Sequence, residues 1–202
     1  DLLVYEIPYY LTLDPEGAKA YALGELNSGN KSVSMANTAT WKRGEVTLGS
    51  GQATVDVDLK PLHKGLVYND ATEMATFTID INPLQLRLND GLAYRLADRY
   101  TNLAVDFNTV SITTAPEAKV EWAYHSNEGT FWIPDETAVT ITYQAWPVGP
   151  RDKTFTMTNT AAMLGFAETV TQDVTLDAGS VWNTEEAVIL VRGAQSSTYT
   201  VS

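Results

Sequence analysis

Apolar and polar residues alternate with a period of two along this chain, and this alternation constrains its fold more than any other feature. It is clearest in residues 54–59, 76–81, 137–143 and 197–202. Successive side chains of a β-strand point to opposite faces, so each of these segments predicts a strand with one buried face and one solvent face. We therefore expect an all-β protein, an antiparallel β-sandwich of the jelly-roll or immunoglobulin-like Greek-key type.

One segment interrupts this alternation and favours a helix. In residues 89–100 the leucines and the arginines recur four residues apart, as they would on one face of a helix, and Asn89 or Asp90 can cap its first turn. We therefore predict one short helix near residues 90–100, crossing an end of the sandwich. Residues 18–26 fit either a short helix or an irregular strand.

The length of 202 residues fits one large sandwich or two domains of about 100 residues each. The sequence Thr-Ala-Pro-Glu at 114–117 is the best candidate boundary, and it would divide the chain into domains 1–113 and 114–202. We prefer a single domain over residues 1–202, because this connector is short and poor in glycine and serine. Residues 61–70 are interpreted as a connection between strands.

The N-terminal segment, residues 1–13, differs from every later strand because it is apolar at both parities. Such a strand needs cover on both faces. It is either an interior strand of its own sandwich or a donor strand that completes the sheet of a neighbouring subunit by β-augmentation. The large side chains of this assembly strand would be Leu2, Leu3, Val4, Tyr5 and Ile7.

The charge of the chain excludes several classes of partner. With 25 acidic and 13 basic residues its formal net charge is −12, which argues against nucleic acid and anionic membranes as partners. No apolar run approaches the roughly 20 residues that span a bilayer, so we expect no direct membrane insertion. The chain begins at Asp1 without an initiator methionine, which fits a removed signal peptide. We expect an extracellular or cell-surface location, with the virion as the alternative.

Catalytic chemistry is not indicated by any motif. The chain has no cysteine, and its two histidines, His63 and His125, lie in no recognisable catalytic context. Asp56 and Asp58 alternate along one strand and are interpreted as part of its solvent face. The loop oxygen ligands of Asn89–Asp90 or Asn69–Asp70 offer only a weak calcium signal, because the EF-hand spacing is absent. We expect no catalytic residue, no metal, no cofactor and no enzymatic activity.

Two further features concern the surface. Asn30 begins the sequence Asn-Lys-Ser and is a candidate for glycosylation. Trp132 and Trp146 are candidates for exposed aromatic side chains that would stack on sugar rings, although most tryptophans of sandwiches belong to the core.

These observations favour a structural function. We expect a non-enzymatic protein that self-assembles, most plainly an extracellular filament, a pilus-type subunit or a surface-layer subunit joined by strand complementation. Its partners would be further copies of itself and other surface or virion proteins. The alternatives are a jelly-roll capsid protein of a virion and a β-sandwich adhesion module that binds carbohydrate or protein.

Overall fold

The computed structural model describes residues 14–23, 32–176, 187–189 and 197–199. The expected assembly strand Leu2–Ile7 and the candidate glycosylation residue Asn30 lie outside these residues. The elements are α1 (Pro15–Leu23), β1 (Ser32–Arg43), β2 (Val46–Asp58), β3 (Leu62–Asn69), β4 (Met74–Ile81), β5 (Tyr94–Thr101), β6 (Leu103–Ala115), β7 (Glu121–His125), β8 (Glu128–Ile133), β9 (Ala138–Pro147), β10 (Thr154–Met163), β11 (Phe166–Thr175), β12 (Ala187–Ile189) and β13 (Ser197–Tyr199).

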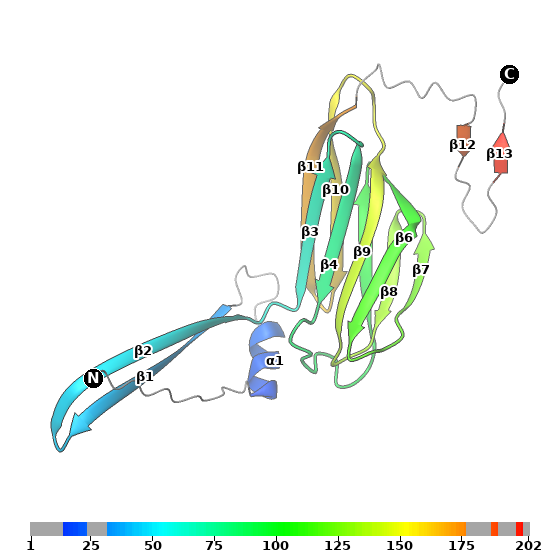
Figure 1. The fold of residues 1–202 in the computed structure, drawn as a ribbon. Coiled ribbons are helices and arrows are strands. Elements are labelled where there is room, and N and C mark those ends of the chain that lie inside the picture. The colour runs from blue at the N-terminus through cyan, green and yellow to red at the C-terminus, as the bar shows by residue number, and fades with distance from the viewer. Residues whose placement is uncertain (1–13, 24–31, 177–186, 190–196, 200–202) are drawn as a thin grey trace.

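Two antiparallel sheets face each other and form a β-sandwich (Figure 1). One sheet has four strands in the order β3-β4-β9-β6, and the other has five in the order β11-β10-β5-β8-β7. The all-β antiparallel sandwich expected from the alternation is therefore present. The short strands β12 and β13 pair with each other.

Both sheets combine strands from before and after residue 114. In the four-stranded sheet β4 pairs with β9, and in the five-stranded sheet β5 pairs with both β8 and β10. The connector 114–117 leads from the edge strand of one sheet toward the edge strand of the other. A division of the chain at this connector would cut both sheets.

The alternating strands place one side-chain set between the sheets. Along β4 and β9 every second residue is buried, and Phe77, Ile79 and Ile141 are at most 1% exposed. Met157 and Ile133 meet them from the opposite sheet. Each large apolar side chain buried in this way contributes roughly 1.5–3 kcal/mol to folding, so the core supplies the main stabilisation of the sandwich.

The helix predicted near residues 90–100 is wrong, because residues 94–101 form the central strand β5. A spacing of four residues fits a strand as well as a helix, since every fourth residue of a strand lies on the same face. Leu96 is buried, whereas Arg95 and Arg99 point outward and both pair with Glu128 on β8.

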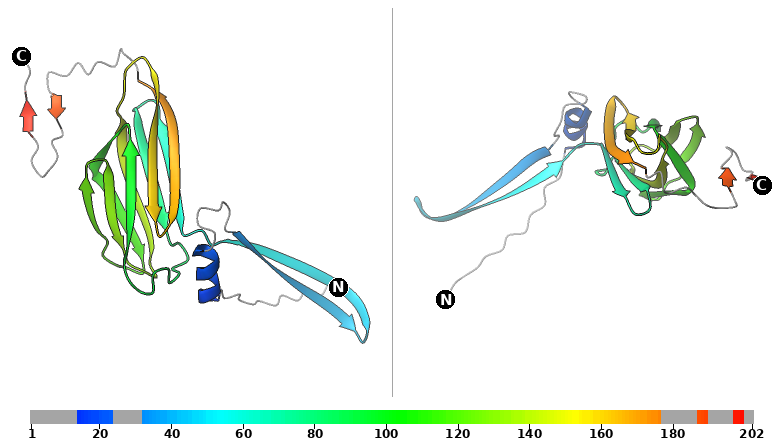
Figure 2. Two further views of the ribbon diagram at one scale, coloured as in Figure 1. Left: turned by 180° about the vertical axis from the view of Figure 1, so that it is seen from behind. Right: turned by 90° about the horizontal axis from the view of Figure 1, so that it is seen from above.

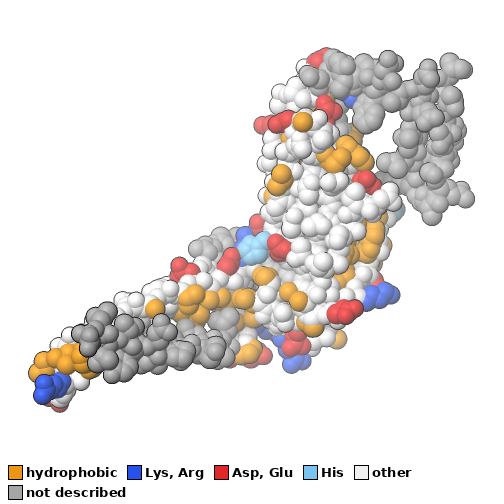
Figure 3. Space-filling view, in the orientation of Figure 1, with side chains coloured by type: hydrophobic (Ala, Val, Ile, Leu, Met, Phe, Trp, Pro, Cys, Tyr) orange, Lys and Arg blue, Asp and Glu red, His pale blue; other side chains and the backbone are white. Residues whose placement is uncertain are grey.

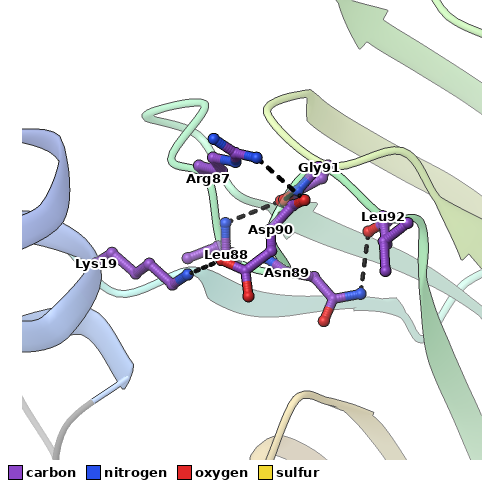
Figure 4. Close-up of polar contacts among 8 residues, drawn as sticks. Lys19, Arg87, Leu88, Asn89, Asp90, Gly91 and Leu92 are labelled. Atoms are coloured by element: carbon purple, nitrogen blue, oxygen red, sulfur yellow. Dashed lines mark hydrogen bonds and ion pairs between the residues drawn. The ribbon is translucent and has the colours of Figure 1, made fainter.

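The helix lies instead at α1, in the region compatible with a helix or an irregular strand. The Asp14 carboxylate caps its first turn by accepting a hydrogen bond of 3.0 Å from the amide of Gly17. Ala18 and Ala22 are buried, and Lys19 forms a 2.6 Å ion pair with Asp90 in the loop that precedes β5 (Figure 4). These contacts dock α1 against one end of the sandwich.

The expected connection at 61–70 is also wrong, because most of it forms the edge strand β3. Its residues 62, 64, 66 and 68 pack on the core side, but Lys64 at one of these positions hides the apolar alternation. A single lysine at an inward position therefore gave this strand the sequence pattern of a loop.

A two-stranded arm, β1–β2, extends away from the sandwich (Figures 1 and 2). Its two strands pair with each other along their full length, with one register shift between Trp41 and Lys42, and with no other strand among the described residues. Most arm residues are exposed, and Val33 and Val57 at its base pack against the edge of the core.

Replacing Phe77 with alanine tests the position of the core. We expect the free energy of unfolding in urea to fall by about 3–5 kcal/mol, because the change leaves a cavity between the sheets. Val67→Ala on β3, where the side chain is 71% exposed, should change it by less than about 0.5 kcal/mol. Equal effects of the two changes would contradict this placement.

Candidate functional site

Four polar side chains meet inside the sandwich, where apolar residues are expected. Lys64 of β3 and Tyr143 of β9 come from the four-stranded sheet, whereas Asp98 of β5 and Asn159 of β10 come from the five-stranded sheet. The side chain of Lys64 is 0% exposed and that of Asp98 is 4% exposed. Asn159 and Tyr143 are 0% and 3% exposed. We call these residues the buried cluster.

The strand register brings the cluster together. Asp98 lies opposite Ala161 and Asn159 lies opposite Tyr100 on the paired strands β5 and β10. The two residues are therefore diagonal neighbours on the inner face of one sheet. Lys64 and Tyr143 reach them from the facing sheet, so the cluster spans the space between the two layers.

Direct contacts connect all four side chains. The Nζ atom of Lys64 donates a hydrogen bond of 2.7 Å to Oδ1 of Asp98. The hydroxyl group of Tyr143 donates to Oδ2 of the same carboxylate and accepts a hydrogen bond from Nδ2 of Asn159. Lys64 Nζ also lies 5.6 Å from the ring centroid of Phe77 and 5.9 Å from that of Tyr143. The carboxylate of Asp98 therefore joins the amine to the phenol, and the phenol joins it to the carboxamide.

Burial changes the ionisation of these groups. Loss of hydration lowers the pKa of Lys64, and the charge and hydrogen bond of Asp98 oppose this shift. Loss of hydration is also the main cause that raises the pKa of Tyr143 well above its usual value, assisted by the charge of Asp98. The Tyr143 hydroxyl thus keeps its proton, whereas the Lys64 ammonium loses its proton more easily than that of a surface lysine.

The carboxamide of Asn159 is only partly satisfied. Its Oδ1 atom is buried without a hydrogen-bond partner, one of two such side-chain atoms among the described residues. Buried polar atoms in folded proteins are nearly always paired, so an unpaired one calls for an explanation. Attack at the carboxamide carbon would develop negative charge on this oxygen, and a nearby proton donor could stabilise that charge.

The cluster contains the groups that acyl transfer requires. A buried amine with a lowered pKa is a nucleophile, a carboxamide is an electrophile, and a carboxyl group in contact with the amine can transfer protons. No external substrate is needed, because all three groups belong to the same chain. The cluster therefore holds the components of an acyl transfer between two side chains of one molecule.

No member of the cluster belongs to a motif that predicts catalytic residues from the sequence. Its lysine, aspartate and asparagine each occupy an inward position of an alternating strand: Lys64 between Leu62 and Leu66, Asp98 between Leu96 and Tyr100, and Asn159 between Met157 and Ala161. A polar residue at an apolar position is the signal that could have found them. Their proximity is visible only in the fold.

The histidines and aspartates considered from sequence lie apart from this cluster. His63 is 37% exposed with its Nε2 atom 3.5 Å from Oδ2 of Asp58, and Asp56 is exposed on the arm. His125 is exposed at the end of β7. The weak calcium candidate Asn89–Asp90 is already contacted by Lys19 (Figure 4). Within the described residues, no group of three or more potential ligands could hold a metal ion.

Among the described residues, the tryptophans of β7, β8 and β9 do not form one platform. Trp132 is 44% exposed on the outer face of β8, opposite Arg95. Trp122 of β7 is opposite Phe131, whose side chain is buried, so it belongs to the inner face at the sheet edge. Trp146 is only partly exposed on β9. In the described part of the chain, none of the helices is both long and apolar enough to cross a membrane.

Comparisons with known proteins give a loose structural likeness. No protein-family model and no curated protein sequence matches the chain. It is similar to the collagen-binding domain of a Staphylococcus aureus adhesin, with 13% identity over 55% of this chain and 95% of that one and a TM-score of 0.41. It is similar to the collagen-binding MSCRAMM ACE of Enterococcus faecalis, with 12% identity over 70% of this chain and 60% of that one and a TM-score of 0.45.

The chain is also similar to BcpA, the major pilin subunit of Bacillus cereus. This match has 10% identity over 70% of this chain and 47% of that one, with a TM-score of 0.38. These structural neighbours are adhesins and pilins. Because the sequence identities and TM-scores are this low, the function of the present chain has to be argued from its own residues.

Removing the Tyr143 hydroxyl tests the contacts of the cluster. We expect Tyr143→Phe to lower the free energy of unfolding by about 1–3 kcal/mol, because Asp98 loses a buried hydrogen-bond donor. Tyr68→Phe on β3, a half-buried tyrosine outside the cluster, should have an effect below about 0.5 kcal/mol. Urea unfolding of both variants measures the difference, and a neutral Tyr143→Phe would contradict the hydrogen bonds described.

Proposed function

We propose that this chain is a non-enzymatic structural domain of an extracellular, self-assembling filament or pilus-type structure, stabilised by an isopeptide bond between Lys64 and Asn159. The observation that carries this proposal is the buried contact of Lys64 with Asp98 in a cluster that also contains Asn159. The reaction occurs once within each molecule, so the domain turns over no substrate.

The proposed reaction balances within the cluster. Asp98 takes a proton from the Lys64 ammonium, which the low polarity of the core already disfavours. The neutral Nζ atom attacks Cγ of Asn159, an Nζ–Cγ bond forms, and the Cγ–Nδ2 bond breaks. The protonated Asp98 gives its proton to the leaving nitrogen, which departs as ammonia, and takes up the proton that the attacking nitrogen loses, so that Asp98 ends as the neutral acid. Tyr143 holds the Asp98 carboxyl group in position.

Such a bond suits a domain that carries tension. It would connect β3, the first strand of the sandwich, directly to β10, one of the last. Force applied to the two ends of the sandwich would pass through a covalent bond, and the strands between residues 64 and 159 would be shielded from it. The chain has no cysteine, so a disulfide cannot provide this connection.

Self-assembly through residues 1–13 remains part of the proposal. The apolar side chains at both parities, Leu2, Leu3, Val4, Tyr5 and Ile7, would each lose roughly 1.5–3 kcal/mol if left in water. A donor strand buried in a neighbouring subunit avoids this loss and joins the copies. An extracellular or cell-surface location and a homopolymeric partner follow from this proposal.

Intact mass measures the isopeptide bond. We expect the folded chain to be lighter than its sequence mass by one ammonia, and we expect a protease digest to contain a branched peptide joining residues 64 and 159. Lys64→Ala, Asn159→Ala and Asp98→Ala should each restore the full mass, the last because the proton carrier is lost. Lys60→Ala is the matched control, since Lys60 pairs with Glu168 at the surface and should keep the deficit.

The same variants have a stability consequence. Closing the long loop between β3 and β10 contributes about 4–5 kcal/mol in the chain-entropy model, so loss of the bond should lower the melting temperature markedly. A folded wild-type chain of full mass would contradict the proposal. A deficit of one water would instead indicate a bond between Lys64 and Asp98, and would exclude Asn159 as the acceptor.

Deletion of residues 1–8 tests the assembly strand. If these residues fill a groove of a neighbouring subunit, the truncated chain should remain a folded monomer that cannot polymerise. A synthetic peptide of residues 1–13 should then bind it and raise its melting temperature. Unfolding of the truncated chain would place the strand in its own core, and normal assembly would show that it joins no copies.

A further inference from the structure

The β1–β2 arm has one apolar face and one polar face. The register pairs Val33 with Val57, Met35 with Val55 and Trp41 with Gly49, and directly opposed residues share a face. The alternate pairs make the other face, which consists of serine, threonine, alanine, glutamine and aspartate side chains. The arm is therefore amphipathic although it has only two strands.

Little covers the apolar face in the described part of the chain. Trp41 is 69% exposed and Val55 is 49% exposed. Hydrophobic side chains are visible along the arm in Figure 3. A two-stranded ribbon is marginally stable by itself in water, and each of its edges presents unpaired backbone donors and acceptors. Both properties favour addition of further strands.

The two edges of the arm are not equivalent. The β2 edge carries Asp56 and Asp58, and its centre contains Gly49 and Gly51. Charges and glycines weaken strand pairing and are common on protected edges. The β1 edge has no charged residue from Ser32 to Trp41, so β1 is the edge suited to pairing.

We propose that the β1 edges of two copies of this chain pair antiparallel about a two-fold axis at Thr38, forming a four-stranded sheet. In this register Thr38 faces Thr38 of the second copy, and Met35 faces Trp41 of the second copy. The offset keeps the apolar side chains of both arms on one face, which a shift of one residue would not. The contact between Met35 and Trp41 is a favourable sulfur–aromatic pair.

The charges of the arm agree with this register. Lys42 near the tip faces Ser34 of the second copy, and Ser34 is itself paired with Asp56. Lys42 and that Asp56 are then two strand spacings apart, about 10 Å between backbones, a separation that their side chains can bridge. The two-fold axis forms this contact twice. Arg43 and Glu45 complete the charges of the tip, and Lys60 and His63 lie near the base.

The pairing extends the self-assembly proposed above and rests on it, but it uses different residues. Pairing over residues 33–43 would bury less than the roughly 1,200 Å² of a standard interface, so the dimer is weak and concentration-dependent. Covalent trapping is therefore the suitable readout. Deletion of residues 1–8 tests the donor strand, and intact mass tests the isopeptide bond, without altering the β1 edge.

The absence of cysteine permits a clean cross-linking test in the full chain. Thr38→Cys places one thiol at the proposed axis, where directly opposed residues have the separation of a disulfide. Gln52→Cys is the matched control, because Gln52 is exposed and paired with Thr38 but lies on the β2 edge. Under mild oxidation we expect disulfide-linked dimers of Thr38→Cys only. No dimer of Thr38→Cys, or equal dimer formation by the control, would overturn the proposal.

Charge exchange provides an independent check in the Thr38→Cys background. Lys42→Glu and Asp56→Lys should each slow cross-linking several-fold, because each places like charges opposite each other. An equimolar mixture of the two variants should form mixed dimers at close to the original rate, since opposite charges face again in both contacts. Unchanged rates for the single variants, or no recovery in the mixture, would contradict the register.

Discussion

The buried contact between Lys64 and Asp98 is the interaction that most constrains the packing of the two sheets. Two charges enclosed between sheets lose their hydration, and their mutual attraction seldom compensates for that loss unless further hydrogen bonds assist. Tyr143 supplies one such bond, and the rings of Phe77 and Tyr143 lie close to the amine. The cost of hydration loss is concentrated where the two layers meet, and the apolar core on either side must supply the stability of the fold.

A buried ion pair alone is a poor stabilising device, since well-packed apolar residues often serve as well. The cluster is therefore better explained by a chemical function than by a contribution to stability. The amine, the carboxyl group and the carboxamide with its unpaired oxygen lie in one cluster, and the low polarity that makes them costly also favours the neutral amine. Our proposal gives this cost a function, because a covalent bond would outlast the charges that formed it.

The arm and the sandwich differ in how many of their backbone hydrogen-bonding groups are paired with neighbouring strands. The sandwich places its strands in sheets of four and five, so most backbone groups are paired and one face of each sheet is buried. Among the described residues the arm has only two strands, and no described strand pairs with either edge or covers its apolar face. Strand addition from another copy would resolve this imbalance, and the uncharged β1 edge determines where it would occur.

The alternation of the sequence determined the all-β class and most strands, because a period of two reports directly which side chains face the core. The sequence pattern wrongly predicted a helix at residues 90–100, since a four-residue spacing fits a helix and a strand equally well. It also failed to indicate β3, since Lys64 occupies a position where the alternation requires an apolar residue. The cluster could have been suspected from three polar residues at inward positions. Only the tertiary structure decided that Lys64, Asp98 and Asn159 meet, because their contact depends on the register of two sheets whose strands are far apart in the chain.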